Sequence, residues 1–392
     1  MIFFNEYFVL ALLAAPVIYW KFVPEKYRNL FIIFFGFIGL SFVQLNFSIF
    51  LMLIVVFVFY AARFMQRSHK GRVLTLIIIV LTLLLAGFKY FKVFYLAIFE
   101  AETDFSKSYL VPLGLSYLIF KLIAYVVDIF REEIKESSLQ GLLAFIFFIP
   151  SFPAGPIERY QHFISGRRNS FDSTFYLAGL KRLTIGYFKK VVLVNFLLTY
   201  IVNTKLSGIL DTDQGALYGS FIALSFLVGS LVYAYIDLSA YADIAIGYGQ
   251  LYGYQICENM NYPLFAQNLS EYWQRWHMSL SQWCRNNVYF PMLGSTRNNN
   301  ISLYASFLVM GLWHYASLNW ILWGLWHASG IIIYSKLNRF RKKKKIKKLL
   351  PKKIGYAVGM AITVIYSGLG FAFITQKTTS EALKLLGKVF GL

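Results

Sequence analysis

Long apolar runs recur along the whole chain at lengths typical of membrane-spanning helices. Two examples are LTLIIIVLTLLLAGF at 74–88 and LVPLGLSYLIFKLIAYVVDIF at 110–130. A helix needs about 20 residues to cross the hydrocarbon core of a bilayer. We therefore expect an all-α polytopic membrane protein of about ten transmembrane helices, with re-entrant or interfacial helices between them. Its predicted crossings include 3–20, 30–45, 47–62, 73–99, 109–130, 215–237, 239–256 and 354–375, and within 172–203 an interfacial helix leads into a further crossing.

Two apolar stretches cannot be simple crossings. The segment AFIFFIPSFPAGPIERY, at 144–160, contains three prolines and a glycine. Such irregular backbone is tolerated at membrane depth only where protein surrounds it or where it lines a cavity, so we expect a re-entrant or short broken segment. The uncharged stretch 301–335 would form a helix about 50 Å long, whereas the core of a bilayer is about 30 Å thick. It must fold back, and HYASLN at 314–319 is the most plausible place.

The distribution of charge supports a membrane protein of defined orientation. Only 14% of the 392 residues are charged, yet the net charge is +20, and ten lysines or arginines lie in 339–353. Between two apolar segments, such a run favours the cytoplasmic membrane surface over nucleic acid as its partner. The loops 21–29 and 63–72 are basic and 100–107 is acidic, which places the first two inside and the third outside. We expect a multi-pass protein of the cytoplasmic membrane with an external N-terminus.

Five histidines are the first candidates for chemistry. His69 lies in a basic loop and His162 follows the proline-broken segment, and we expect both to be solvated side chains. His314 lies at the inferred fold-back, where an ionisable group at membrane depth marks a pathway or a site by default. An apolar surround would keep its imidazole neutral and able to accept a proton from a hydroxyl. The alternative at this stage is a histidine that hydrogen-bonds a helix backbone.

The stretch YWQRWHMSLSQWC, at 272–284, is unusually aromatic and polar. Asn268 and Glu271 have the spacing of a capping box, and tryptophans and a leucine follow at helical spacing. We expect one amphipathic interfacial helix that brings His277 inward, with tryptophans that pack the helix or stack on a ligand. His327 has the weakest claim, because it could cap an interface stripe of Trp320, Trp323 and Trp326.

Other site types lack their signatures. The sequence holds no HxxxH pair, no CxxC pair, no phosphate-binding or dinucleotide loop and no GxSxG motif, so we predict no metal site and no bound cofactor. Cys257 and Cys284 are the only cysteines, which excludes a disulfide framework. Asp237 and Asp243 could form a proton relay or local hydrogen bonds.

Four blocks in order resemble the bacterial membrane-bound O-acyltransferases. They are SFPAGPIERY, YIDLSAYADIAIGYGQLYGY, ENMNYPLFAQNLSEYWQRWHMSLSQWCRNNVYFPM and GLWHYASLNWILWGLWH, between about 150 and 327. The resemblance is to the branch with alginate and peptidoglycan O-acetyltransferases and the D-alanyl transferase of teichoic acids. It implies a ring of tilted helices around a central tunnel, in which a cytoplasmic acyl thioester passes its acyl group to a hydroxyl on the outer side. A single domain, 1–392, would then comprise N-terminal helices (1–136), a catalytic core (137–335) and a basic loop with the last helix (336–392).

The resemblance also implies roles for particular residues. The family's catalytic histidine corresponds to His314 and its second characteristic histidine to His277. We expect His314 to accept the hydroxyl proton and His277 to polarise the thioester carbonyl or orient the donor. Around them, the candidate tunnel or donor-binding residues are Trp273, Arg275, Trp276, Arg285, Trp313, Tyr315 and Asn319.

This chain departs from the usual pattern of the family at three places. Asn286 and Asn287 stand in an Arg-Asn-Asn triplet where an Arg-Asp-aromatic triplet is common, Tyr315 replaces a glycine, and PMLGS replaces Pro-Leu-Gly-Gly. The first change removes a carboxylate near the donor entry, and the second places a bulky ring beside the base.

Several functions fit the sequence. The leading hypothesis is O-acetylation of a cell-envelope polysaccharide, with acetyl-coenzyme A or an acyl carrier as donor and an extracytoplasmic acetyl-transferring or esterase-like partner. The alternatives are D-alanylation fed by a small acidic carrier protein, a transporter without chemistry, and an inactive scaffold.

Overall fold

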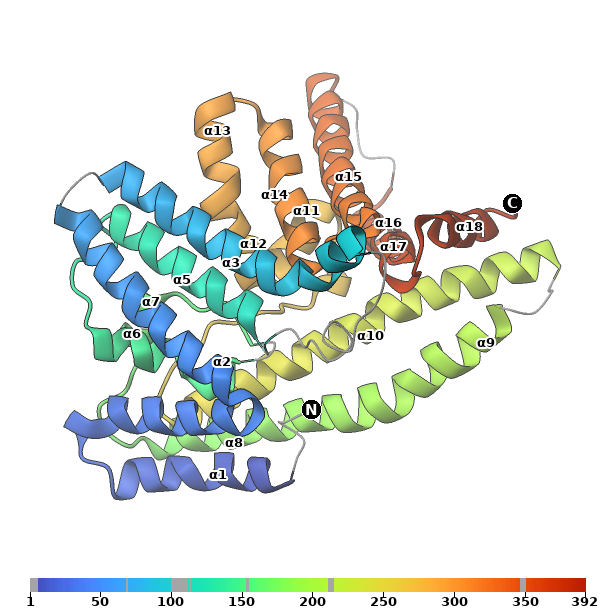
Figure 1. Ribbon diagram of the computed structural model, residues 1–392. Helices are drawn as coiled ribbons and strands as arrows, with labels where there is room; N and C mark the ends of the chain where they lie inside the picture. The colour runs from blue at the N-terminus through green and yellow to red at the C-terminus, as the bar shows by residue number, and fades with distance from the viewer. Residues whose placement is uncertain are drawn as a thin grey trace. The chain divides into compact units, whose positions relative to one another are not determined.

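The computed structural model describes residues 6–67, 70–99, 112, 114–152, 155–210, 215–345 and 350–392, and every element named within them is a helix (Figure 1). The chain forms two compact units. The first contains Met1–Thr184 and Asp243–Cys257, and the second contains Ile185–Ala242 and Glu258–Leu392. His69, the acidic loop 100–107 and residues 346–349 of the basic run lie outside the described residues.

The first unit contains the longest described helix, α2. Its elements are α1 (Glu6–Lys21), η2 (Glu25–Tyr27), α2 (Arg28–Arg67), α3 (Lys70–Phe99), α5 (Leu115–Phe130), α6 (Leu139–Ile146), η3 (Ile149–Ser151), α7 (Tyr160–Ser165) and most of α8 (Ser173–Phe188). Two crossings were predicted at 30–45 and 47–62, but α2 runs through both. It bends sharply at Gln44, whose φ of −152° and ψ of 82° are not helical (Figure 1). The predicted boundary is therefore a kink within one helix.

The proline-broken segment of the first unit is short and buried, as predicted. α6 ends at Ile146, and η3 follows with Phe147, Phe148 and Ile149 at most 5% exposed. Protein groups satisfy this irregular backbone and its polar side chains. For example, the buried Lys121 donates to Ser151 Oγ at 2.7 Å, and Ser151 Oγ donates to the carbonyl of Phe148 at 2.9 Å. Its re-entrant course through the membrane stays a prediction.

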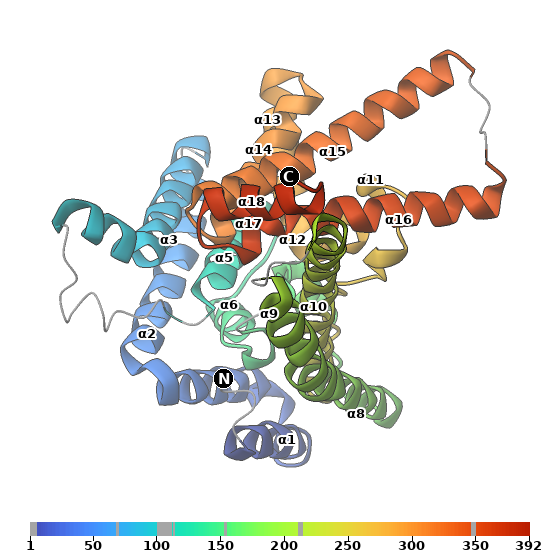
Figure 2. The ribbon, with the colours of Figure 1, turned by 90° about the vertical axis from the view of Figure 1, so that its right-hand side faces the viewer.

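The second unit holds the remaining elements. They are η4, a π-helix (Lys189–Leu206), α9 (Ser207–Leu210), α10 (Ala216–Leu251) up to Ala242, η5 (Pro263–Phe265), α11 (Leu269–Arg275), α12 (Met278–Cys284), η6 (Arg285–Tyr289), α13 (Phe290–Thr296), α14 (Asn299–His314), α15 (Leu318–Lys343), α16 (Lys352–Gly370), α17 (Ala372–Thr375) and α18 (Thr379–Val389). The end of α15 and the start of α16 carry the described basic residues of 339–353, and both extend to the right of the view in Figure 2. The capping box of Thr378 and Glu381 starts the amphipathic tail α18.

The prediction of two crossings at 215–237 and 239–256 is wrong, because α10 is a single helix of 36 residues. At 1.5 Å per residue it is about 54 Å long, more than a bilayer core requires. Cationic side chains bind three polar residues of this helix. In the second unit Lys190 Nζ lies 2.5 Å from Asp237 Oδ1, and Lys189 Nζ donates to Ser239 Oγ at 2.8 Å. In the first, Arg182 Nε lies 2.7 Å from Asp243 Oδ1. Local ion pairs, not a visible relay, thus account for both aspartates.

Among the described residues, five helical segments are long and apolar enough to cross a membrane. They are Glu25–Arg67, Lys70–Phe91, Ser173–Leu210, Ala216–Leu251 and Lys352–Thr375. The expected all-helical membrane protein is confirmed. The ring of about ten helices around a tunnel, and the subdivision at 136 and 335, stay predictions.

Candidate active site

The fold-back at the centre of the second unit is where the sequence predicts it. α14 ends at His314, three residues connect it to α15, and Ser317 caps α15 by accepting from Trp320 N. Two glycines let the helices approach closely. A Cβ on Gly311 would lie 2.3 Å from Trp320 O, and one on Gly324 would lie 2.5 Å from Phe307 O. The close packing of these helices places the His314 ring over the first turn of α15.

Tryptophan rings surround the His314 imidazole. It is stacked on Trp320, with 4.4 Å between ring centroids and 13° between planes. Trp313 and Trp323 meet it edge-on at 4.7 and 5.7 Å. His314 itself is partly exposed. Its ring is therefore held in one orientation while part of the residue stays exposed.

His277 lies where the predicted single helix is broken, so the expectation of one continuous helix over 268–284 is wrong. The cap at Asn268 is confirmed, since Asn268 Oδ1 accepts from Glu271 N at 2.9 Å. However, α11 ends at Arg275 and α12 begins at Met278. His277 between them has φ +43°, a left-handed conformation that is uncommon for residues other than glycine. Such residues gather at functional sites, where the surrounding structure holds them.

A buried asparagine holds this break. Asn259 is fully buried; its carbonyl accepts from Met278 N at 2.8 Å, and its Oδ1 accepts from Ser279 N and Oγ at 3.2 and 2.8 Å. The His277 side chain is 2% exposed and faces Trp313 at 6.1 Å between ring centroids. Burial lowers the pKa of His277 to about 4, so its imidazole is neutral at pH 7. Trp313 thus lies between the two predicted histidines and contacts both.

His327 belongs to the same cluster, which the sequence did not indicate. It is 1% exposed, and Trp273 Nε1 donates to its Nδ1 at 3.3 Å. Trp323 contacts His327 at 5.0 Å and His314 at 5.7 Å, so one indole joins the two histidines. The expectation that His327 caps an interface stripe is therefore wrong, because α11 packs against α15 and buries Trp323 and His327.

The other predicted tunnel or donor-binding residues separate into two groups. Trp273 and Trp313 lie in the histidine cluster, and Trp276 stacks on Tyr272 at 5.4 Å. Tyr315, directly after His314, is 46% exposed. The remaining three have contacts elsewhere: Arg275 pairs with Glu271 at 2.7 Å, Asn319 bonds the carbonyl of Gln376 and the hydroxyl of Thr379, and Arg285 lies over Phe290.

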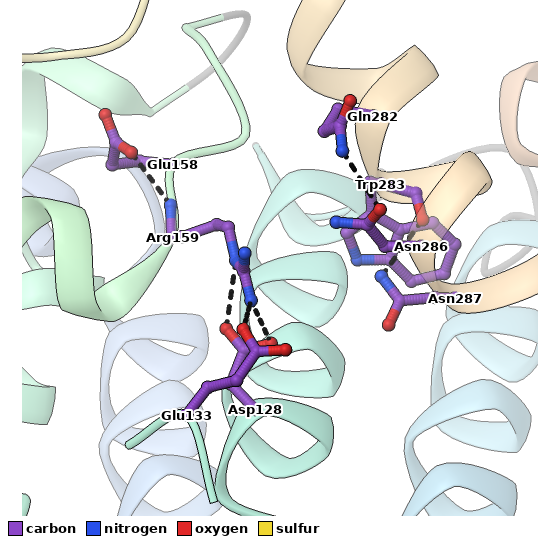
Figure 3. A network of polar contacts seen from close by, with 8 residues as sticks. All are labelled: Asp128, Glu133, Glu158, Arg159, Gln282, Trp283, Asn286 and Asn287. Atoms are coloured by element: carbon purple, nitrogen blue, oxygen red, sulfur yellow. Dashed lines mark hydrogen bonds and ion pairs between the residues drawn. The ribbon is translucent and has the colours of Figure 1, made fainter. Parts of the chain in front are cut away.

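The Arg-Asn-Asn triplet, where this chain departs from the family pattern, lies in η6, a π-helix that directly follows α12 in the sequence. Gln282 Nε2 donates to Asn286 Oδ1 at 2.9 Å, and Asn287 Nδ2 donates to the carbonyl of Trp283 at 3.0 Å (Figure 3). Both asparagines therefore make local hydrogen bonds along this turn, Asn286 with a side-chain amide and Asn287 with a backbone carbonyl. π-helical turns occur frequently at functional sites.

In the first unit, a second polar network contradicts the expectation that His162 is merely solvated. Its Nδ1 lies 2.9 Å from Oε1 of Glu158, a carboxylate that is 2% exposed. Glu158 Oε2 accepts from Cys257 N at 2.7 Å. Burial alone would raise the pKa of Glu158, but these partners outweigh it and lower that pKa. The hydrogen bond to Glu158 raises the pKa of His162. The spacing of four residues between the two was the signal available in the sequence.

No group of three or more histidines, cysteines or acidic residues that could hold a metal ion occurs within the described parts of the chain. The three clustered histidines are separated by indole rings. Their arrangement is suited to proton transfer and to the exclusion of water from a substrate.

The family model of the membrane-bound O-acyltransferases, MBOAT, matches residues 88–374, which is more than half of the chain. The chain belongs to the MBOAT family. Membership places it among the acyltransferases.

Curated relatives of this MBOAT protein differ in substrate. The probable alginate O-acetylase AlgI of Azotobacter vinelandii is 28% identical over 85% of this chain and 68% of its own length. The peptidoglycan O-acetyltransferase of Helicobacter pylori is 28% identical over 83% of this chain and 66% of its own length. The teichoic acid D-alanyltransferase of Bacillus subtilis is 28% identical over 59% and 61%. This chain thus spans about two thirds of the length of these relatives.

Proposed function

We propose that this protein supplies the acetyl group for O-acetylation of a cell-envelope polysaccharide from the cytoplasmic membrane, which it crosses several times. A cytoplasmic thioester, acetyl-coenzyme A or an acyl carrier, supplies the acetyl group. The acceptor hydroxyl oxygen attacks the thioester carbonyl, the C–S bond breaks, and the thiol leaves as the ester forms. His314 accepts the proton of the hydroxyl and returns it to the departing thiolate.

The observation that carries this proposal is the setting of His314. Its ring is partly exposed, yet stacking on Trp320 and edge contacts with Trp313 and Trp323 fix its orientation. A thioester is already activated, so the enzyme must mainly align two reactants and remove one proton. Alignment can contribute about 7–11 kcal/mol and a positioned base typically adds about 10²- to 10⁴-fold.

His277 has a different role in this proposal. Its buried, neutral imidazole can donate a hydrogen bond to the thioester carbonyl or orient the donor, whereas burial makes it a poor base. The indoles of Trp273, Trp276 and Trp313 would keep water from the thioester. The hydroxyl acetylated in this step would be carried by an extracytoplasmic esterase-like or acetyl-transferring protein, which would then pass the acetyl group to the sugar.

A direct assay tests the proposal. Purified protein in nanodiscs is supplied with radiolabelled acetyl-coenzyme A, and both the release of free thiol and the transfer of label to an acceptor are measured. We expect His314→Ala to lose at least about 10²-fold in turnover, and His162→Gln, a histidine change in the other unit, to retain it. If His314→Ala matched the wild type on an active donor, the assignment of the base would be wrong.

D-alanylation of teichoic acid is the second candidate. The basic residues at the end of α15 and the start of α16 form a cationic end that suits an acidic carrier protein (Figure 2). The similarity to a teichoic acid D-alanyltransferase points the same way. His314-dependent turnover of a D-alanyl-loaded carrier, without turnover of acetyl-coenzyme A, would select this candidate.

A further inference from the structure

A pocket of about 350 Å³ lies in the first unit, away in sequence from every residue of the candidate active site. It is formed where α2 ends, α3 begins and α5 ends. Its lining residues are Met65, Gln66, Lys70, Ile129, Phe130, Glu132, Ile134 and Lys135. Two segments supply most of them, 63–72 and 131–136. The charge pattern places 63–72 on the cytoplasmic side, and Lys70 of this segment pairs with Glu132 of the other.

The lining of this pocket is amphipathic. Met65, Ile129 and Ile134 are at most 4% exposed and form an apolar floor, and Phe130 adds a partly exposed ring. Lys70, Lys135, Glu132 and Gln66 supply the polar rim. An apolar concavity with a few polar groups at its rim is typical of a small-molecule site. Two lysines against one glutamate favour an anionic ligand.

One wall of the pocket is rigid. The turn after α5 closes through bonds from Glu133 N and Ile134 N to the carbonyl of Asp128, at 2.9 and 3.3 Å. Arg159 clamps this turn, since its Nε donates to Asp128 Oδ2 at 3.1 Å and its Nη2 bonds both Asp128 and Glu133 (Figure 3). The clamp holds Glu132 in a left-handed conformation, with φ +61°, at the rim. Such strain persists only where neighbouring structure enforces it.

The ion pair between Lys70 and Glu132 at the rim is weak enough for an anionic ligand to replace Glu132. Lys70 Nζ lies 3.0 Å from Glu132 Oε1, but the two side chains are 54% and 74% exposed. An ion pair so open to water contributes little to stability, because solvent screens it. A phosphate that approaches Lys70 can therefore replace Glu132 at low cost.

We propose that this pocket binds the phosphate of an anionic phospholipid headgroup, a site separate from the acyl transfer proposed above. Lys70 and Lys135 contact the phosphate, and Phe130 and the apolar floor pack against the glycerol backbone. A lipid is favoured over a soluble ester because the pocket lies beside the ends of two segments able to cross a membrane, Glu25–Arg67 and Lys70–Phe91. Lipid headgroups are concentrated at that level, and cationic side chains there attract anionic lipids.

The test measures lipid binding by native mass spectrometry of the full-length protein in detergent, titrated with phosphatidylglycerol or phosphatidylcholine. We expect saturable binding of phosphatidylglycerol that exceeds binding of phosphatidylcholine. Lys70→Gln and Lys135→Gln should each weaken it about five-fold, which is the value of one lysine near an anionic surface. Glu132→Gln should strengthen it, because it frees Lys70.

Two matched controls remove the same charges outside the pocket: Arg72→Gln on α3 and Glu136→Gln after the turn, both exposed. We expect neither to change the binding of phosphatidylglycerol. Equal shifts in the controls, or equal binding of the two lipids, would overturn the proposal. Competition by soluble glycerol phosphate at concentrations comparable to those of the lipid would also overturn it, in favour of a soluble ester. The readout does not depend on acyl transfer, so this proposal and the proposed function can fail separately.

Discussion

The indole nitrogen of Trp273 on α11 donates a hydrogen bond to Nδ1 of His327 on α15, at 3.3 Å in the buried core of the second unit. This bond requires the His327 tautomer that carries its proton on Nε2. A Cβ on Gly370 would lie 3.1 Å from that Nε2, so the ring is also confined on its far side. His327 in turn contacts Trp323, which contacts His314. The pair therefore supports the wall of the candidate active site.

Breaking this bond is predicted to destabilise the protein. Trp273→Phe keeps an aromatic ring but leaves a buried acceptor on His327 without its donor, which costs about 1–3 kcal/mol. Trp273→Phe should cost less stability in the His327→Leu background, because that variant has no buried Nδ1 acceptor that loses its donor. Thermal unfolding of the wild type, Trp273→Phe, His327→Leu and the double variant in detergent gives the coupling between the two sites. Additive effects of the two changes would contradict the bond.

The sequence predicted the position of His314 better than that of its neighbours, for a physical reason. A run of 35 uncharged residues exceeds the thickness of a bilayer, so a fold-back was required, and the structure breaks the helices at 315–317. The burial of His327, by contrast, depends on α11 packing against α15, more than 40 residues apart in sequence. Tryptophans at a spacing of three look the same in an interface stripe and in a packed core.

The residues around His277 also gave no signal that the helix breaks there. No glycine or proline occurs in 272–284, and the pattern of tryptophans continues across the break. The left-handed residue is instead held by Asn259, which lies 18 residues upstream of it. Similarly, α10 runs as one helix past Asp237, which pairs with Lys190 on η4. In both cases the partner is distant in sequence, and periodicity contains no information about it.

His277 should make the stability of the protein depend on pH. Its folded pKa of about 4 is below the ordinary value of 6.5, so the unfolded chain binds a proton between these values and the folded chain does not. Stability should therefore fall as the pH is lowered from 7 towards 4. The largest loss of folding free energy from this one group is roughly 3 kcal/mol, because each pKa unit corresponds to about 1.4 kcal/mol.

The thermal unfolding midpoint at pH 7 and pH 5 measures this effect. His277→Asn is the useful variant, because asparagine adopts left-handed backbone more readily and does not titrate in this range. We expect the loss of stability at pH 5 to be smaller in His277→Asn than in the wild type. The same loss in both proteins would show that His277 is not the group responsible.

The close contact of α14 and α15 should be sensitive to one methyl group. Gly311→Ala would place a Cβ 2.3 Å from Trp320 O, so the helices must separate. Overpacking of this kind costs about 1–3 kcal/mol. His314 lies three residues after Gly311 on α14. A separation of the helices would change the stacking of His314 on Trp320, so turnover should fall at least about 10-fold.

Gly294→Ala is the matched control for this change. Gly294 also lies in a helix, α13, and a Cβ there would meet no atom within 4 Å. It should unfold at the wild-type temperature or above, because alanine favours helices. Thermal unfolding and acyl-transfer assays of both variants check the prediction. If Gly311→Ala had the turnover of the wild type, the helix contact would not position His314.

The Glu158–His162 pair should contribute stability within a limited pH window. The pKa of Glu158 is lowered in the folded protein, so its contribution is present above the ordinary value of 4.5 and is lost as the pH falls through the folded value. The pKa of His162 is raised, so its contribution is complete below 6.5 and is lost as the pH rises through the folded value. The two conditions overlap between 4.5 and 6.5. Because the His162 side chain is 43% exposed, solvent limits the pair to about 1 kcal/mol.

Glu158→Gln tests this window, because glutamine can still accept from Cys257 N while it loses the charge that attracts His162. We expect the difference in unfolding temperature between wild type and Glu158→Gln to be largest near pH 5.5 and to shrink by pH 8. Glu136→Gln, an exposed glutamate outside the network, should show no such pH dependence. A constant difference from pH 5 to pH 8 would mean that the pairing of Glu158 with His162 contributes nothing measurable to stability.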